Sequence, residues 1–140
     1  MNAALKYILV DDDHLCNAIS TMMLHNAFEE VEIKAFTRPD EALAFIEKEY
    51  AKSGGPTILF LDINMPKIDG WQFLERYDNF SDEIKQQINI YMLSSSIYSK
   101  DKNKAEANNN VKGFISKPLS VEILTSIVEK GFQFQKFSLD

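Results

Sequence analysis

The chain has 140 residues, a net charge of −6 and a composition that is 45% apolar and 26% charged, which is typical of one compact domain. The acidic balance, with no segment dense in lysine and arginine, argues against nucleic-acid binding, and no apolar run approaches the roughly 20 residues of a membrane-spanning helix. The single cysteine, Cys16, excludes an internal disulfide and no signal-peptide pattern is visible, so we expect a protein of the reducing cytoplasm.

The chain begins with two strand patterns separated by a helix pattern. Residues 7–10 form a short apolar run that stops at acidic residues, as in a buried strand, and residues 31–36 alternate apolar and charged side chains. A helix over residues 13–28 is predicted between them, because apolar residues recur at helical spacing and Asp13 can cap its start. These recurring residues are Leu15, Ile19, Met22 and Met23.

A second helix and a third strand follow. Residues 37–40 read as a capping box whose proline stands in the first turn, where its missing N–H costs nothing. A cluster of helix breakers over residues 53–56 ends this helix. Residues 57–61 then form the most apolar strand candidate, which stops at Asp62. The helix carries one apolar face, made of Leu43, Ile46 and Tyr50.

After a turn over residues 65–70, the second half continues the alternation. A third helix has a modest apolar face that includes Trp71, Leu74 and either Tyr77 or Asp78. Residues 88–93 form a fourth buried strand that ends in three serines.

The end of the chain contains a fifth strand and a last helix. Residues 100–110 are rich in lysine and asparagine and read either as a poorly anchored helix or as a loop. Residues 111–116 form the fifth strand, and a helix from residue 120 to about residue 132 turns four apolar residues inward. These are Val121, Leu124, Ile127 and Val128.

Strands that alternate with helices predict right-handed βαβ units and a mostly parallel sheet covered on both faces. Five units predict an α/β, flavodoxin-like (βα)5 sandwich of three layers. Its strand order, 2-1-3-4-5, is borrowed from known flavodoxin-like proteins, because the sequence alone does not determine it. We expect one domain over residues 1–140, with a core of about residues 5–131 and a C-terminal tail over residues 132–140.

Open parallel sheets bind ligands beyond the carboxyl ends of their strands, here at the switch between strands one and three. Polar residues stand at those ends in four of the five predicted strands. We therefore expect five reactive side chains to converge on one rim, namely Asp11, Asp12, Asp62, Ser94 and Lys117.

Crowded carboxylates repel one another, so cations are needed to keep them ionised. Lys117 supplies one, and Mg²⁺ suits the site as the other, because it is typically held by one or two carboxylates and accepts phosphate oxygens. Asp12 and Asp62 are the expected direct ligands, with the backbone carbonyl of Asn64 as a third. Asp11 is expected to act through a coordinated water.

A carboxylate at such a rim can attack phosphorus and become an acyl phosphate. Asp62 is the predicted nucleophile. Phosphoryl transfer depends on positioning and on neutralising the moving oxygens, which the metal ion, Lys117 and the Ser94 hydroxyl would supply.

Four blocks of the sequence resemble response-regulator receiver domains. They are Ile-Leu-Val-Asp-Asp-Asp, Leu-Asp-Ile-Asn-Met-Pro-Lys-Ile-Asp-Gly, Met-Leu-Ser-Ser and Gly-Phe-Ile-Ser-Lys-Pro, in the family's order and each at a predicted strand end. The resemblance, to CheY-like proteins of one domain, implies that Asp62 is the phosphoacceptor and Lys117 the phosphate-binding lysine. It also implies that Asp11 and Asp12 are the acid pair and that the Lys117–Pro118 bond is cis.

The resemblance further implies that Ser94 and Phe114 are switch residues. Serine at position 94 keeps the hydroxyl of the commoner threonine and drops a methyl group that restricts the rotamer. Ser95 is an alternative to Ser94, because neighbouring residues of a strand point to opposite faces. Phenylalanine at position 114 lacks the hydroxyl of a tyrosine.

These observations favour a single-domain response regulator of a two-component phosphorelay, which is not a turnover enzyme and loses its phosphoryl group slowly. Its partners would be a sensor histidine kinase or histidine phosphotransfer protein and a downstream protein, with the chain a monomer or weak dimer. It would signal through a surface around strands four and five and the last helix. Two alternatives remain, a Mg²⁺-dependent phosphohydrolase, for which Asn64 replaces the expected second acid, and a phosphate-independent binding scaffold.

Several other residues receive structural interpretations. Asp13 and Asp69 read as cap and turn residues, and His14 and His25 as solvated helix residues, because no four-helix phosphotransfer pattern surrounds them. Met65 and Trp71 are expected to pack near the site entrance. The tail aromatics either complete the core or leave an apolar patch for a partner, and they are Phe132, Phe134 and Phe137.

Overall fold

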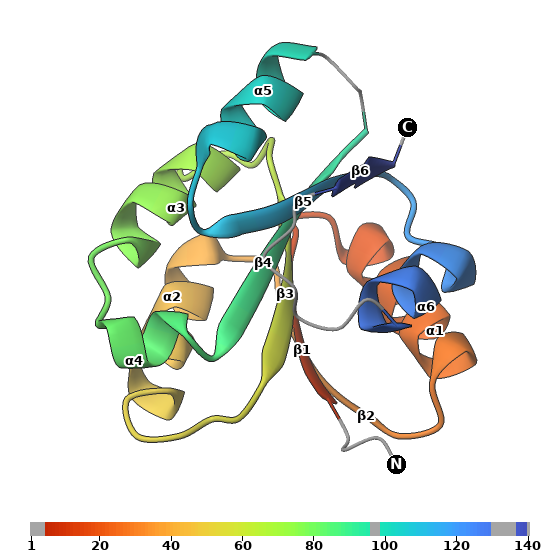
Figure 1. The fold of residues 1–140 in the computed structure, drawn as a ribbon, viewed down its shortest axis with the longest axis horizontal. Coiled ribbons are helices and arrows are strands. Elements are labelled where there is room, and N and C mark those ends of the chain that lie inside the picture. The colour runs from red at the N-terminus through yellow and green to blue at the C-terminus, as the bar shows by residue number, and fades with distance from the viewer. Residues whose placement is uncertain (1–4, 96–98, 130–136, 140) are drawn as a thin grey trace.

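The computed structural model describes residues 5–95, 99–129 and 137–139. Helices and strands alternate along the chain in nearly the predicted order (Figure 1). In chain order the elements are β1 (Leu5–Val10), α1 (His14–Ala27), β2 (Val31–Phe36), α2 (Pro39–Glu49), β3 (Thr57–Asp62), α3 (Gly70–Tyr77), α4 (Asp82–Lys85), β4 (Ile88–Ser94), α5 (Ser99–Ala107), β5 (Val111–Ser116), α6 (Val121–Glu129) and β6 (Phe137–Leu139).

The sheet is parallel throughout the described residues, with the strand order β2-β1-β3-β4-β5-β6. The first five strands follow the predicted order 2-1-3-4-5, and the predicted flavodoxin-like fold is therefore confirmed. The short strand β6, which was not predicted, pairs with β5 at the edge of the sheet. Parallel pairing of β1 with β3 brings their carboxyl ends together, since Val10 lies opposite Leu61.

Helices cover both faces of the sheet. Figure 1 shows α1 and α6 on one face and α2, α3 and α4 on the other. Alternate residues of each central strand enter the two cores: in β3, Leu59 and Leu61 pack under α2 and α3, whereas Ile58 and Phe60 pack under α1 and α6. Burial on both faces explains why β3 is a continuous apolar run. Within the described ranges, no helix is long and apolar enough to cross a membrane.

Helix α1 buries only part of its apolar pattern, since Met23 packs against the core whereas Leu15 and Met22 lie outside. Leu15 is 66% exposed and Met22 is 53% exposed. The buried residues of this helix are instead Asn17, Ser20 and Leu24. A buried polar side chain is stable when its hydrogen bonds are satisfied, and the partners of Asn17 are the carbonyl groups of Asp11, just after β1, and of Phe36, the last residue of β2.

The capping box predicted at the start of α2 is wrong. The helix begins at Pro39, and its N-cap is Arg38, whose side chain makes no capping hydrogen bond. For Thr37 to be the cap, Arg38 would have to be helical, which is disfavoured for a residue that precedes proline. Arg38 accordingly has an extended backbone, with φ of −120° and ψ of 113°. The predicted inward face of the helix is confirmed, because Leu43, Ile46 and Tyr50 are buried.

Helices α4, α5 and α6 add detail to the prediction for the second half of the chain. The short helix α4 was not predicted. The segment that reads as helix or loop contains the helix α5, and within it Ala105 is buried against the core. In α6, Leu124 and Ile127 are buried, whereas Val121 and Val128 are half-buried. The alternatives for the tail aromatics concern side chains outside the described residues.

The side chain of Gln87, between α4 and β4, forms hydrogen bonds with the loop that follows α2. Its Oε1 accepts hydrogen bonds from the N–H groups of Gly54 at 2.6 Å and Gly55 at 3.1 Å. Its Nε2 donates to the backbone carbonyls of Tyr50 at 3.0 Å and Glu83 at 2.9 Å. One amide thus holds α2, α4 and the start of β3 together at the amino ends of the strands.

Candidate functional site

Four strands deliver polar side chains to the carboxyl end of the sheet. Asp11 and Asp12 follow β1, Asp62 is the last residue of β3, and Ser94 is the last residue of β4. Lys117 follows β5, and its N–H donates to the carbonyl of Ser94 at 2.8 Å. Each apolar strand therefore stops where its first reactive side chain meets the rim.

Lys117 joins two of the aspartates. Its Nζ lies 2.7 Å from Asp11 Oδ2 and 3.0 Å from Asp62 Oδ1. Both carboxylates are almost fully buried, whereas Asp12 is exposed. One ammonium group thus bridges the ends of β1 and β3, which are 106 and 55 residues away from it along the chain.

The three aspartates form one cluster. Asp11, Asp12 and Asp62 can each place a carboxylate oxygen within 4.8 Å of the other two. Burial raises the pKa of Asp62 to about 6, the hydrogen bond from Lys117 lowers it, and the nearby charges of Asp11 and Asp12 raise it further. The single ammonium group therefore does not balance the negative charge that gathers around Asp62.

Lys117 itself stays charged. Burial acts to lower its pKa, but its hydrogen bonds with Asp11 and Asp62 and their negative charges outweigh that effect, so the pKa rises above its ordinary value. The lysine is held in place as a permanent cation beside the Asp62 carboxylate.

The donor set fits a hard divalent cation. Carboxylate and carbonyl oxygens are the ligands that Mg²⁺ prefers. The three clustered carboxylates carry three negative charges, of which Lys117 balances one, so a divalent ion would balance the remaining two. Asp12 is exposed and so faces the solvent from which an ion and its waters would come. Asn64, also exposed, lies two residues after Asp62, where its backbone carbonyl would complete the set.

The two predicted switch residues lie on neighbouring strands. Ser94 is buried and lies opposite Ser116 in the sheet, whereas Ser95 is exposed. Phe114 is fully buried and belongs to the core cluster that also contains residues of α2, α3, α4 and α5. The Lys117–Pro118 peptide bond is cis, as the resemblance implies.

The sequence did not single out Asn17, although this residue supports the acid pair. Its Nδ2 donates to the carbonyl of Asp11 at 3.1 Å and to the carbonyl of Phe36 at 3.2 Å. The N–H of Asp11 also donates to Phe36 at 3.0 Å, and the N–H of Asp13 donates to Asp11 Oδ1 at 2.9 Å. The backbone at the acid pair is thereby tied to α1 and to the end of β2. The available signal was a polar residue five positions after Asp12.

Cys16 also lies beside the site, which the sequence did not indicate. Its Sγ is 3.9 Å from Lys117 Nζ, and the thiol is half-buried. Burial and the negative charge of Asp11 raise its pKa, so the group stays a protonated thiol at neutral pH.

Asp13 and Asp69 have structural roles at the starts of helices. Asp13 caps α1 by accepting a hydrogen bond from the N–H of Leu15 at 2.8 Å, and Asp69 caps α3 in a capping box with Gln72. Met65 is buried in the core, and Trp71 lies partly buried beside it. His14 and His25 are exposed on α1.

Gly70 brings α3 directly against the loop that follows β3. A Cβ atom at this position would lie 2.7 Å from the carbonyl oxygen of Asp62 and 3.0 Å from both Ile63 Cα and Met92 Cε. The N–H of Gly70 donates to the carbonyl of Ile63 at 2.8 Å. The absence of a side chain thus allows the first turn of α3 to hold the backbone of Asp62 in place.

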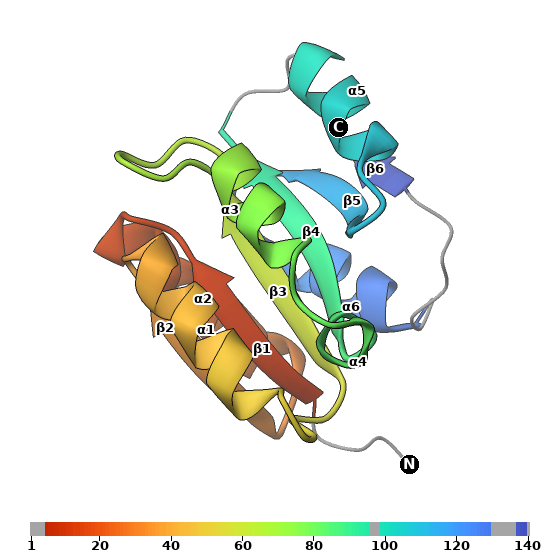
Figure 2. The same cartoon turned by 90° about the vertical axis from the view of Figure 1, so that its left-hand side faces the viewer.

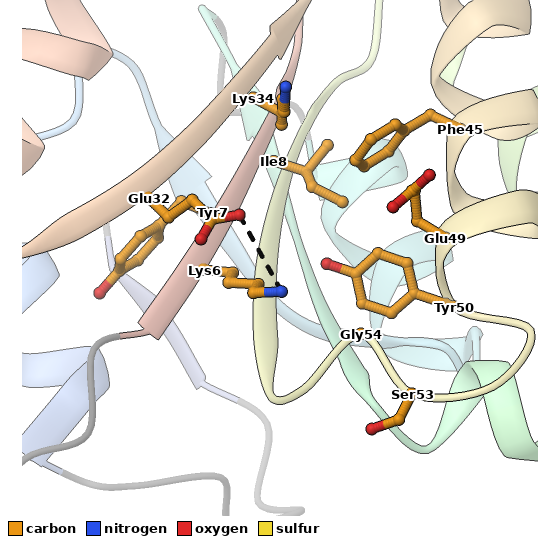
Figure 3. Close-up of a pocket in the computed structure, with 10 residues that line it drawn as sticks. All are labelled: Lys6, Tyr7, Ile8, Glu32, Lys34, Phe45, Glu49, Tyr50, Ser53 and Gly54. Atoms are coloured by element: carbon orange, nitrogen blue, oxygen red, sulfur yellow. Dashed lines mark ion pairs between the residues drawn. The ribbon is translucent and has the colours of Figure 1, made fainter.

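A separate pocket of about 240 Å³ lies near the amino ends of β1 and β2, away from the three aspartates (Figure 3). Across it Lys6 Nζ is 4.0 Å from Glu32 Oε2, and Lys34 Nζ is 5.9 Å from the ring centroid of Phe45. Two lysines and two glutamates line the pocket, so its charges balance one another.

A family model described as the response regulator receiver domain matches residues 7–129. A solved two component response regulator from Cytophaga hutchinsonii is 30% identical, with a TM-score of 0.85 over 92% of this chain and 97% of that one. A response regulator receiver protein from Dyadobacter fermentans DSM 18053 shares the fold at 24% identity, with a TM-score of 0.83 over 91% of this chain and 97% of that one.

Curated relatives match a smaller part of the chain. A protein-glutamate methylesterase/protein-glutamine glutaminase from Methylobacillus flagellatus is 36% identical over 72 residues, which are 51% of this chain and 19% of that protein. A second protein of that description, from Burkholderia pseudomallei, is 36% identical over 54% of this chain and 20% of its own length. The chain thus spans about a fifth of the length of these relatives.

Proposed function

The chain belongs to the response regulator receiver domain family, and we propose that it accepts a phosphoryl group on Asp62 within a two-component phosphorelay. The observation that carries the proposal is the position of Lys117, which lies 3.0 Å from Asp62 and 2.7 Å from Asp11 beneath a cluster of three carboxylates. A fixed cation beside one buried carboxylate suits a site that accepts a phosphate group.

The acid pair and Asp62 would hold Mg²⁺, with Asp12, Asp62 and the backbone carbonyl of Asn64 as direct ligands and Asp11 bound through water. The bound ion supplies positive charge to the phosphoryl oxygens. It also favours the ionised form of Asp62, which is the form that attacks, because a nearby cation lowers a carboxylate pKa.

The transfer requires little of the protein beyond positioning. An Oδ atom of Asp62 forms a bond to phosphorus while the bond between phosphorus and the donor atom breaks, and the leaving group takes that electron pair and a proton. The ammonium group of Lys117 would contact the phosphoryl oxygens, because it already contacts Asp62, and it would keep Asp11 as its second partner. Ser94, at the end of the neighbouring strand, provides a hydroxyl to the product.

The signal would leave the site through β4 and β5. Ser94 ends β4, and Phe114 lies in β5 on the strand next to it. Movement of Ser94 toward the phosphoryl group would change the packing around Phe114, and the surface formed by β4, β5 and α6 would report the state to a partner.

The proposed setting is a cytoplasmic protein of one receiver domain over residues 1–140, a monomer or weak dimer. A sensor histidine kinase or a histidine phosphotransfer protein would donate the phosphoryl group, and a separate downstream protein would receive the signal. The chain would not turn over substrate but would lose its phosphoryl group slowly by hydrolysis. The methylesterase name describes longer relatives, of which this chain matches about a fifth.

Intact-mass measurement after incubation with acetyl phosphate and Mg²⁺ tests the proposal. We expect one added phosphoryl group on the wild-type chain, none on Asp62→Asn, and normal addition to Asp69→Asn, which removes a carboxylate that only caps α3. Equal addition to Asp62→Asn would exclude Asp62 as the acceptor. Sustained turnover of small phosphate esters would instead indicate a phosphohydrolase.

A further inference from the structure

The side chain of Lys104, in α5, lies over the ring of Trp71, in α3. Its Nζ is 4.5 Å from the ring centroid, well inside the distance of about 6 Å within which a cation is attracted to the face of an indole ring. Figure 2 shows α5 at the end of the sheet where β4 stops and α3 begins. The contact therefore joins α5, which carries none of the site residues, to the helix that follows the proposed phosphoacceptor.

The Trp71 side of this contact is fixed to the backbone that follows Asp62. Trp71 lies in the first turn of α3, one residue after Gly70, whose N–H donates to the carbonyl of Ile63 at 2.8 Å. A capping box at Asp69 closes the same turn, and the ring of Trp71 is partly buried against the core. Movement of Trp71 would therefore disturb the loop that follows Asp62.

The other side of the contact, α5, is held less firmly. The sequence of this helix is almost entirely polar, and among its described side chains only Ala105 is buried. A helix with so small an apolar face gains little from burial, so a single contact can bias its position. In addition, α5 begins at Ser99, shortly after β4 ends at Ser94, so a movement at the end of β4 would be passed to this helix.

We propose that the contact between Lys104 and Trp71 stabilises the unphosphorylated state by holding α5 against α3, and that it breaks when Asp62 is phosphorylated. The inference rests on the function proposed above and adds two residues outside the site that influence its equilibrium. Movement of Ser94 toward the phosphoryl group draws the end of β4 and the start of α5 with it. Trp71 stays with α3, and Lys104 leaves the ring.

Thermodynamic linkage gives this contact a measurable effect on the site. A contact that exists in only one of two states disfavours the other state. Coupling between two positions is reciprocal, so if modification of Asp62 breaks the contact, loss of the contact must favour modification of Asp62. A cation–π contact at an exposed site corresponds to a factor of about two to five in an equilibrium constant. The contact should lower the affinity of the site for a phosphoryl-like group by that factor.

The experiment measures the binding of beryllofluoride, which takes the place of a phosphoryl group on a carboxylate oxygen and binds reversibly. Fluorine NMR at saturating Mg²⁺ measures its affinity without relying on the tryptophan. Lys104→Met removes the cation and keeps an unbranched side chain, and it should tighten binding about two- to fivefold. Lys104→Arg keeps a cation over the ring and should bind like the wild type. The matched control is Lys100→Met, which removes the same charge from an exposed residue of the same helix and should not tighten binding.

A double-mutant cycle tests whether Lys104 acts through Trp71. Trp71→Leu removes the ring and should tighten binding by about the same factor as Lys104→Met. Trp71→Leu/Lys104→Met should bind no more tightly than either single variant, because both substitutions remove one contact. Melting temperatures identify any general loss of packing, which would not produce tighter binding that fails to add.

Fluorescence follows the contact itself. Trp71 is the single tryptophan of the chain, so its emission reports the surroundings of this ring alone. Saturation of the wild type with beryllofluoride should move the emission toward that of unloaded Lys104→Met. Most of this change should be absent when Lys104→Met is saturated in the same way.

The outcomes separate this inference from the proposed function. If beryllofluoride binds to the wild type but Lys104→Met and Lys100→Met have equal affinities, the contact is not coupled to the site and this inference is overturned. Full additivity in the cycle would also overturn it, because Lys104 and Trp71 would then act independently. If the wild type neither binds beryllofluoride nor is phosphorylated by acetyl phosphate, the proposed function fails and this inference fails with it.

Discussion

The amide of Asn17 offers a sharp test of how the acid pair is held. Asn17→Ala removes two hydrogen bonds, at 3.1 Å to the carbonyl of Asp11 and at 3.2 Å to the carbonyl of Phe36. Phe36 keeps the N–H of Asp11 as a donor at 3.0 Å, so only the Asp11 carbonyl loses the partner described for it. With about 1 kcal/mol for each hydrogen bond, we expect the free energy of unfolding to fall by about 2 kcal/mol.

The same substitution should weaken Mg²⁺ binding. The backbone of Asp11 and Asp12 loses its hydrogen bond to α1. Loss of a hydrogen bond that orients metal ligands typically lowers metal affinity about tenfold. Isothermal titration calorimetry with Mg²⁺ measures the affinity, and urea denaturation in a chelator measures the stability. Phosphorylation at saturating Mg²⁺ should recover toward the wild-type rate, because Asn17 contacts neither Asp62 nor Lys117 in the described interactions.

Ser20→Ala is the matched control, because Ser20 is also a buried polar residue of α1 but lies farther from the acid pair along the helix. It should reduce stability and leave Mg²⁺ affinity unchanged. If both variants bind Mg²⁺ within about twofold of the wild type, a range that corresponds to only about 0.4 kcal/mol, Asn17 has a packing role only and the reasoning is refuted.

Three further predictions concern Asp62, Gly70 and Gln87. Burial raises the pKa of Asp62 to about 6, so the folded protein holds this proton more tightly than the unfolded chain does. Without metal, the free energy of unfolding of the protein should therefore fall as the pH rises from about 4 to about 6. Asp62→Asn should remove that fall in urea titrations, and an unchanged pH profile would contradict the assignment. Gly70→Ala should destabilise the protein by about 1–3 kcal/mol in thermal unfolding and weaken Mg²⁺ binding, because its Cβ would push against the Asp62 carbonyl. Gln87→Ala, which breaks four hydrogen bonds at the opposite end of the sheet, should cost about 2–4 kcal/mol yet leave Mg²⁺ affinity unchanged, and a weaker affinity would show that the two ends are coupled.

The strands and the rim were predictable because both leave a local signal. A strand buried on two faces must be continuously apolar, and β3 is such a run that stops at Asp62. The cap at Asp13 is also local, since its acceptor and donor are two residues apart. Parallel pairing then determines that the strand ends meet, and the carboxylates that follow those ends therefore cluster.

The remaining features depend on partners that are distant in sequence. The inward face of α1 could not be read from its apolar residues, because Asn17 is buried only where the carbonyls of Asp11 and Phe36 are both within reach. Leu15 and Met22 are left outside as a result. The predicted cap of α2 is wrong for a local reason, because Pro39 in the predicted capping box disfavours a helical backbone at Arg38.

Charge balance explains why the site can act as a switch under the proposed function. Three carboxylates and one ammonium group leave a net charge of −2, which a bound divalent ion would cancel. An acyl phosphate on Asp62 carries about one more negative charge than the carboxylate it replaces. Lys117 stays shared between Asp11 and Asp62, at 2.7 Å and 3.0 Å, so its single positive charge does not balance the added charge alone. The added charge must therefore find a new donor at the rim, and the hydroxyl of Ser94, at the end of the adjacent strand, is the group that can supply it with the smallest rearrangement.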